Sequence, residues 1–222
     1  NAGGTFPAGS TGSPSITFTT DTDTGIYRRG SGDIGFVSNS TEIVNIDGNG
    51  LTVTGKDATI NSINIGKGAN SVTGNTVLGE NALDASNSGT GNNTAIGKDA
   101  LTSNTSGNFN VAVGSSSLGN NTTGVNNTAI GTLALDASQT ANNNTAVGVH
   151  ALGANTTGAQ NVAMGVLALD DNTTASNNTA VGYIALRKNT TASNNTAVGY
   201  FALAENTTGT QNTAVGTEAL DA

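Results

Sequence analysis

The repeating arrangement of apolar and polar positions is the clearest feature of this sequence. The segment NNTAVGYIAL at residues 177–186 returns almost unchanged as NNTAVGYFAL at residues 194–203. Its central glycine recurs every 17 residues, and one further copy precedes the series by 18 residues. These glycines are Gly79, Gly97, Gly114, Gly131, Gly148, Gly165, Gly182, Gly199 and Gly216. A fixed short period predicts a stack of units, in which each unit buries its apolar side against the next.

We number each repeat from its glycine, so that position −1 precedes the glycine and position +1 follows it. Asn stands at −4, Ala at −2 and a larger aliphatic residue at −1, and the glycine is followed by Ala at +3 and Leu at +4. A polar connector such as NTTG or NTTA completes the repeat. In the two clearest copies the structural positions are Asn178, Ala180, Val181, Gly182, Leu186 and Asn195, Ala197, Val198, Gly199, Leu203.

This spacing predicts two short strands in each repeat, separated by the glycine and closed by a polar loop. A helical repeat is disfavoured, because the central glycine and the NTT connector are poor helix formers and few residues remain for two helices. Stacked repeats would form parallel ladders about 4.8 Å apart. We therefore predict a parallel β-solenoid, or β-roll, of nine rungs over residues 75–222. The glycine is expected to provide a bend or a positive φ, and the Asn side chains to form ladders.

The two apolar positions before the glycine must face opposite ways, because side chains alternate along a strand. The columns of Val and Leu are predicted to form the continuous interior. The small Ala at −2 would then suit the close approach of another chain, which predicts a multimer. A monomeric solenoid with Ala facing solvent is the alternative.

The region before the repeats carries a different pattern, of short alternating segments separated by Gly and Asp. It predicts strands at residues 15–19, from residue 26, and at 34–38, 41–46 and 51–55. Turns are predicted at residues 21–25, 30–33 and 47–50, after an extended lead-in containing Pro7 and Pro14. The chain thus divides into a short-stranded β region at 1–56, a transition at 57–74 and the repeats at 75–222.

Composition narrows the classes of function. The formal net charge is −8 and only 10% of residues are charged, which disfavours nucleic acid as a partner. The adjacent basic pairs Arg28-Arg29 and Arg187-Lys188 are expected to be solvated surface. There is no cysteine, no run long enough to span a membrane and no recognisable signal peptide. Asn1 is expected to be a fragment boundary.

The sequence offers little material for catalysis, and we expect a protein that is not an enzyme and binds no cofactor or metal. His150 is the only histidine, which disfavours His-dependent triads and transition-metal clusters. Asp21 and Asp23 have the opening spacing of a calcium loop, but Gly32 stands where the bidentate Glu is needed. Glycoside hydrolysis requires two carboxylates. The candidates are expected to be scattered over non-equivalent positions of the repeats: Asp99, Asp136, Asp170, Asp171, Glu205 and Glu218.

Recognition is expected at the positions that vary between repeats. Positions +1 and +2 vary most, and their candidate contacts with a host surface are Tyr183, Ile184, Tyr200, Phe201 and His150. Exposed aromatic rings could stack on sugars, while Asn and Thr in the connectors could bond to hydroxyl groups. The alternative is that the aromatic side chains fill a groove between chains.

The repeat NTAVGxxAL resembles the NSVAIG-type repeats of the left-handed β-roll heads of trimeric autotransporter adhesins. It also resembles the NNTAVGYxAL…NTTG repeats of bacteriophage tail fibres, and the 17-residue spacing implies longer connectors than those of the adhesins. Residues 13–51, from SPSITFTTDTDTGIYRRG to IDGNGL, look like the segment that precedes such repeats in fibres ending in an endosialidase-type intramolecular chaperone. Together the two resemblances cover almost the whole chain.

The resemblance implies a homotrimeric tail fibre in the virion, whose autoproteolytically released chaperone is not part of this chain. The implied partners are two further copies, other tail or baseplate proteins, and a polysaccharide or protein on the bacterial surface, without membrane insertion. The implied function is structural and adhesive. A capsule-degrading, tailspike-like enzyme and the head of a bacterial trimeric adhesin remain alternatives, and an ice-binding solenoid is a remote one.

Overall fold

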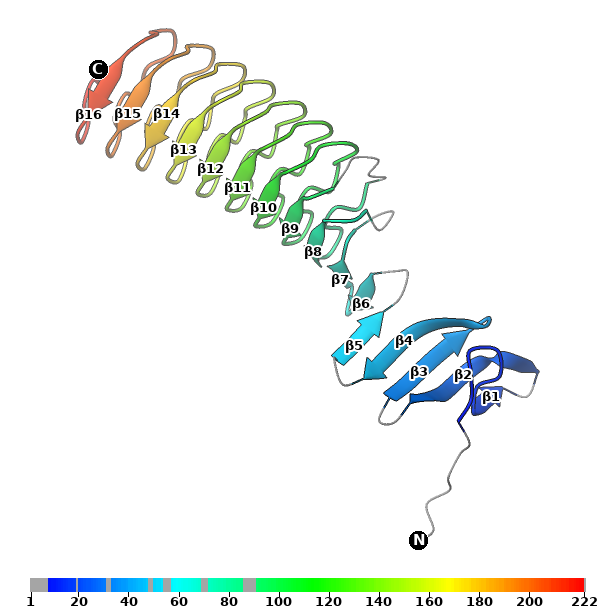
Figure 1. Ribbon diagram of the computed structural model, residues 1–222. Helices are drawn as coiled ribbons and strands as arrows, with labels where there is room; N and C mark the ends of the chain where they lie inside the picture. The colour runs from blue at the N-terminus through cyan, green and yellow to red at the C-terminus, as the bar shows by residue number, and fades with distance from the viewer. Residues whose placement is uncertain are drawn as a thin grey trace. The chain divides into compact units, whose positions relative to one another are not determined.

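The fold is all-β and consists of two compact units, residues 1–58 and 59–222 (Figure 1). It is known from a computed structural model. The structure describes residues 8–18, 20–30, 33–47, 50–53, 57–68, 72–85 and 91–221. Within these ranges the regular elements are strands and no helix occurs.

The first unit is a five-stranded antiparallel sheet in which each strand pairs with the next along the chain. Its strands are β1 (Ile16–Phe18), β2 (Asp21–Gly30), β3 (Asp33–Ser38), β4 (Thr41–Asp47) and β5 (Gly50–Val53). Five strands were expected, but the predicted turn at residues 21–25 is wrong. Those residues belong to β2 and pair with β1 and β3, where Gly25 lies opposite Thr17 and Val37. The predicted lead-in at residues 1–7, the centres of the turns at 30–33 and 47–50, and residues 54–55 lie outside the described ranges.

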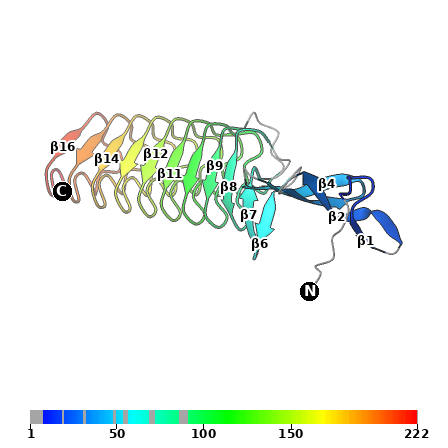
Figure 2. The same cartoon turned by 60° about the horizontal axis from the view of Figure 1, so that its bottom comes forward.

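The second unit is a parallel β-solenoid (Figure 2). It begins with β6 (Ala58–Ile60) and β7 (Ile63–Gly66), and β7 pairs antiparallel with the first strand of the repeats. Each repeat then contributes one strand that pairs in parallel with its neighbours. These strands are β8 (Thr76–Gly79), β9 (Thr94–Ile96), β10 (Val111–Val113), β11 (Thr128–Ile130), β12 (Thr145–Val147), β13 (Val162–Met164), β14 (Thr179–Val181), β15 (Thr196–Val198) and β16 (Thr213–Val215).

Each coil of the solenoid contains one strand, not the two that the sequence predicts. The segment after the glycine is a tight turn, because residues at +2 and +4 adopt a left-handed backbone; His150 and Leu152, for example, have φ of 56° and 53°. This turn still joins neighbouring coils, since the Leu152 N–H donates to the Ala168 carbonyl at 3.0 Å. Such backbone angles are unfavourable for leucine. Coil-to-coil hydrogen bonds and burial of the leucine side chain offset this cost.

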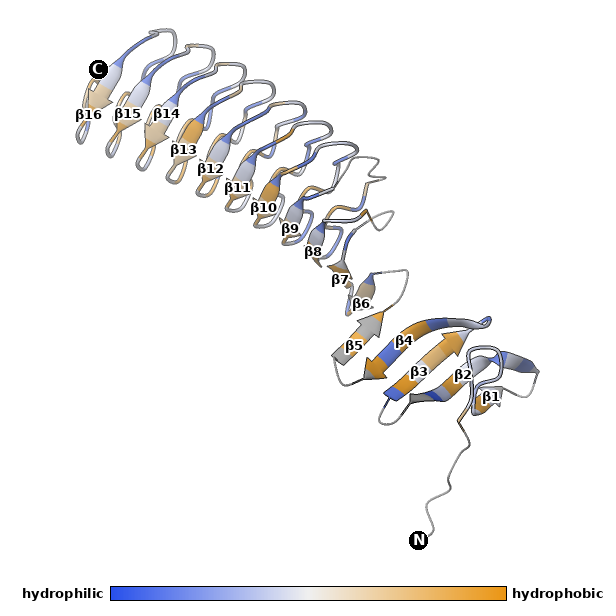
Figure 3. Cartoon of the chain, viewed as in Figure 1, coloured by the Kyte–Doolittle hydropathy of each residue, from blue (hydrophilic) through white to orange (hydrophobic). Residues whose placement is uncertain are grey.

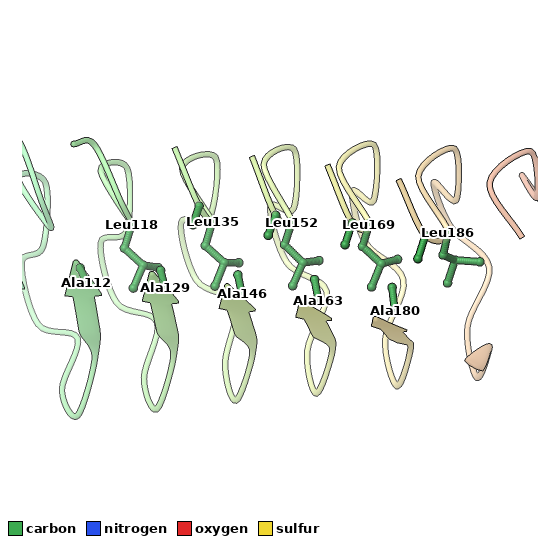
Figure 4. Packing of buried hydrophobic residues seen from close by; sticks show 14 of the residues in the cluster. Ala112, Leu118, Ala129, Leu135, Ala146, Leu152, Ala163, Leu169, Ala180 and Leu186 are labelled. Atoms are coloured by element: carbon green, nitrogen blue, oxygen red, sulfur yellow. The ribbon is translucent and has the colours of Figure 1, made fainter. Parts of the chain in front are cut away.

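The core of the solenoid is built from alanine and leucine. The Ala side chains at −2 and +3 and the Leu side chains at +4 are buried in the inner coils (Figure 4). Figure 4 shows the labelled leucines and strand alanines directed toward one another inside the coils. The prediction for Leu is therefore confirmed, while the prediction that Ala at −2 faces another chain is wrong. The larger aliphatic residue at −1 lies outside, as Met164, 45% exposed, and Val215, 70% exposed, demonstrate.

Two columns of buried asparagine flank this apolar core. The predicted ladder at −4 is confirmed: Asn144 Oδ1 accepts the backbone N–H of Asn161 at 2.9 Å, and Asn161 Nδ2 donates to Asn144 Oδ1 at 3.2 Å. A second ladder lies at +7, in the connector, where Asn172 Nδ2 donates to Asn155 Oδ1 at 2.8 Å. Side-chain amides from both columns of a coil bond to one carbonyl, at position +10, as Asn144 and Asn155 do to Gly158, so these amides are paired within and between coils.

The central glycine adopts the positive φ that the sequence predicts. From Gly97 to Gly216 its φ lies between 131° and 143°. A Cβ placed on Gly148 would lie 2.5 Å from the carbonyl oxygen of Gly165, the equivalent glycine in the next coil. Both the backbone angle and the close stacking of neighbouring coils therefore require glycine.

Candidate functional site

Three aromatic side chains of adjacent coils form one group, which we call the aromatic cluster: Tyr183, Tyr200 and Phe201. The rings of Tyr183 and Tyr200 are stacked, with centroids 5.6 Å apart and planes inclined by 16°. Phe201 is tilted against both rings, with centroid distances of 5.8 Å to Tyr183 and 4.6 Å to Tyr200. The two tyrosines are 44% and 50% exposed.

The 17-residue period brings these rings together. Strands β14 and β15 pair with Val181 opposite Val198, so the +1 residues of the two coils follow in register. The Phe201 N–H then donates to the Tyr183 carbonyl at 3.0 Å. Of the five candidate contacts expected from the sequence, Tyr183, Tyr200 and Phe201 lie together in this cluster, whereas Ile184 and His150 lie outside it. Ile184 is only 8% exposed.

The geometry limits how the cluster can contact a ligand. Each tyrosine ring has one face against the other ring, so at most one face of each is open to a sugar. Their exposed edges and hydroxyl groups can donate and accept hydrogen bonds. The cluster therefore suits a ligand that offers both apolar C–H groups and polar groups.

A charged row runs along another set of positions: Asp136, His150, Asp170 and Arg187. Asp170 Oδ1 lies 3.9 Å from His150 Nδ1, and Asp170 Oδ2 lies 3.9 Å from Arg187 Nε. Asp136 and Asp170 both stand at +5, two coils apart, and Gly153 occupies the same position between them. A Cβ on Gly153 would lie 2.8 Å from Asp170 Oδ1. The absence of a side chain at Gly153 thus leaves room for this carboxylate.

Burial dominates the acidity of the two carboxyl groups in the charged row. It raises the pKa of Asp136, and the nearby His150 opposes that shift. Burial also raises the pKa of Asp170, the negative charge of Asp171 raises it further, and His150 and Arg187 oppose both effects. Both groups are consequently weaker acids than an exposed Asp.

The sequence prediction missed this relationship, because it treated the acidic residues as occupying unrelated positions. The position within the repeat could have revealed it, because Asp136 and Asp170 each stand five residues after the glycine of their repeat, Gly131 and Gly165. The expected solvated basic pair is confirmed only in part. Lys188 is half exposed and bonds Glu205 at 2.5 Å, whereas Arg187 belongs to the charged row.

The described acidic residues of the first unit include the pair with the opening spacing of a calcium loop. Asp21 and Asp23 lie in β2, and Asp23 Oδ2 accepts a hydrogen bond from Ser40 Oγ at 3.1 Å. Across the described ranges, no group of three or more His, Cys, Asp or Glu side chains is arranged to hold a metal ion. The same ranges contain no helix long and apolar enough to cross a membrane.

Comparisons with protein-family profiles, with characterised proteins and with solved structures find no match to this chain.

Proposed function

We propose that this chain is a structural and adhesive segment of a bacteriophage tail fibre that helps attach the virion to the bacterial surface. The observation that carries the proposal is the contrast between a repeated scaffold and a variable exposed cluster. The same Asn, Ala, Gly and Leu positions build every coil, while exposed positions beside the glycine change and become aromatic at Tyr183 and Tyr200. This is how a rigid repeat protein presents a binding surface.

The proposed receptor is a bacterial surface glycan, and a surface protein is the alternative. Sugars present apolar C–H faces together with hydroxyl groups, which matches rings that have exposed edges, hydroxyl groups and one open face. The fibre is proposed to be a homotrimer joined to other tail or baseplate proteins, as its sequence resemblance implies.

The test is binding of the purified protein to a panel of bacterial strains and to an array of bacterial surface glycans. We expect wild type to bind a subset of strains. The double variant Tyr183→Ala/Tyr200→Ala is expected to bind those strains at least tenfold more weakly. Phe109→Ala removes another exposed aromatic residue, outside the cluster, and should leave binding unchanged. Absence of wild-type binding to every strain and glycan, or full binding by the double variant, contradicts the proposal.

The charged row supports a second candidate, a capsule-degrading hydrolase. Asp136 and Asp170 are separated by two coils, about 10 Å along the stack, close to the carboxyl spacing of inverting glycosidases. A carboxyl group with a raised pKa can serve as the general acid. Incubation with purified capsules would release shortened oligosaccharides, and Asp170→Asn would abolish that release. Intact capsules after incubation with wild type would exclude this candidate.

A further inference from the structure

The large aliphatic residues at −1 form a continuous exposed column on the solenoid, which we call the outer stripe. Every member is half-buried or exposed, although each is Leu, Ile, Val or Met. Figure 3 shows the apolar colour on the solenoid strands, strongest in β10 and β13. The members of the outer stripe are Leu78, Ile96, Val113, Ile130, Val147, Met164, Val181, Val198 and Val215.

The outer stripe itself carries no charge, although the chain has a net charge of −8. The neighbouring column at −3 on the same strands contains only Thr and Val. At the spacing of parallel strands, nine coils make a surface about 40 Å long and roughly 15 Å wide, on the order of 600 Å². A typical protein interface removes about 800 Å² from each partner, while exposed apolar patches of monomers rarely exceed about 600 Å². The outer stripe is therefore as large as the largest apolar patches of monomers, and it would supply about three quarters of the area that one partner typically buries in an interface.

Comparison of the exposed columns indicates that this apolar character is specific. Position +1, also exposed, carries residues as different as Glu80, Lys98, Thr132 and Tyr183. Position −1 never carries a polar residue in nine coils. Thr would satisfy the preferences of a strand equally well and would be better hydrated. An apolar contact at −1 explains the difference.

We infer that the outer stripe is the surface on which a second copy of this chain packs, parallel and in register. The stripe repeats once per coil, at about 4.8 Å. A copy of the same chain presents the same repeat, so each apolar side chain can meet its counterpart along the whole length. An unrelated protein would lack this periodic match.

The first unit gives independent support for association between copies. Ile34, Ile46 and Leu51 are neighbours across β3, β4 and β5 and are 46%, 43% and 66% exposed. An antiparallel sheet commonly leaves one face solvated, but that face is then usually polar. The same apolar row on another copy of the chain could cover this one.

This inference rests on the multimeric part of the proposed function and is tested separately from attachment. Light scattering of wild type should give a multiple of the 21.7 kDa chain mass. The double variant Val147→Lys/Val181→Lys places two charges in the middle of the outer stripe and should give the single-chain mass, with an unchanged β circular dichroism spectrum. The matched control is Thr140→Lys/Thr174→Lys, two exposed positions with the same two-coil separation, which should keep the wild-type mass.

A milder variant guards against loss of folding. Val147→Thr/Val181→Thr keeps the shape and strand preference of Val, and should raise the dissociation constant of the multimer at least tenfold. A monomeric wild type, or multimers unaffected by both stripe variants, would overturn the inference. If the wild type is monomeric but binds cells, the inference about the outer stripe fails and the attachment proposal stands. If the stripe variants dissociate the multimer but the wild type binds no cells, the attachment proposal fails and the inference stands.

Discussion

Within the described coils, the asparagine column at +7 is interrupted by Ser138, and the surroundings of this serine explain what each amide contributes. Asn121 Oδ1 and Ser138 Oγ are both buried and have no hydrogen-bond partner in the described part of the chain. In the regular part of the column, the Asn of the following coil donates to this oxygen, as Asn172 does to Asn155 at 2.8 Å. A serine side chain is too short to reach it.

Ser138→Asn should therefore stabilise the solenoid. The backbone at Ser138 matches that of its neighbour, since its N–H donates to the Leu135 carbonyl at 3.2 Å, as the Asn121 N–H does to Leu118 at 3.1 Å. The new amide would satisfy a buried acceptor, which is worth about 1 kcal/mol. Thermal and urea unfolding should show a higher midpoint. The converse change Asn172→Ser should lower the free energy of unfolding by about 1–3 kcal/mol. An unchanged or lower midpoint for Ser138→Asn would refute this account of the ladder.

The carboxyl group of Asp136 gives a prediction for pH dependence. Burial raises its pKa in the folded chain above the ordinary value of 3.8. The folded state then binds the proton more tightly than the unfolded state, so stability rises as the pH falls through the folded pKa toward 3.8. Above the folded pKa, the ionised carboxylate weakens the fold.

Asp136→Asn removes this ionisation and should raise the unfolding midpoint at pH 7, with the advantage disappearing below about pH 4. The gain is expected to stay within about 0.5 kcal/mol, because the group keeps part of its hydration. The control is Asp84→Asn at an exposed position, which should change stability equally little at both pH values. Melting curves at pH 7 and pH 3.5 provide the measurement, and a stability loss at pH 7 would contradict the assignment.

At the scale of the element, the bend after each strand depends on glycine. Gly148→Ala should destabilise the solenoid by about 2–4 kcal/mol, since alanine is strained at a φ of 136° and its Cβ would meet the Gly165 carbonyl oxygen. Gly153→Ala is the matched control in the same coil. Its nearest neighbour is the carboxylate at the end of the Asp170 side chain, which can shift more easily than backbone, and Ala204 already occupies the equivalent position, so the cost should be below about 1 kcal/mol. Equal unfolding midpoints for the two variants would show that the bend tolerates a side chain.

The strand also illustrates how far the sequence determines the fold. Alternation predicts that Ala180 and Val181 face opposite ways, but it does not say which face is inside. Leu186 fills the narrow coil, so the opposite strand has room only for a methyl group. The uniform size of the side chain at −2 could have identified the inner face. Position −2 is Ala in eight of nine repeats, while position −1 accepts Leu, Ile, Val and Met.

The second predicted strand failed for a different reason. A strand was expected because Ala and Leu at +3 and +4 follow an apolar pattern, but residues such as Leu152 adopt a left-handed backbone that their chemistry disfavours. Hydrogen bonds to the next coil stabilise that backbone, and such partners cannot be recognised within one repeat. The candidate sites also differ in how far the sequence predicts them. The aromatic candidates could be named from their positions in the repeat, whereas the acidity of Asp136 depends on burial, which the pattern does not report.

For the whole molecule, stability should depend on neighbouring coils rather than on a single central core. Each coil contacts the coil before it and the coil after it through the same ladders. Removing one complete repeat should leave a shorter solenoid of the same kind. Deletion of residues 132–148 joins Gly131 to Val149, which preserves the phase of the repeat. Deletion of residues 115–131 joins Gly114 to Thr132 in the same way.

These two deletion variants should differ in stability, because only one of them restores the asparagine ladder at +7. Removal of residues 132–148 eliminates Ser138 and brings Asn121 beside Asn155, which restores an unbroken +7 column. Removal of residues 115–131 keeps the interruption, now beside Asn104. The variant without residues 132–148 should therefore unfold at a higher urea concentration, and its free energy of unfolding should be larger by about 1 kcal/mol. Deletion of residues 132–140, nine residues and out of phase, should abolish cooperative unfolding of the solenoid. If that chain unfolds like the 17-residue deletions, coil-to-coil register is not what holds the molecule together.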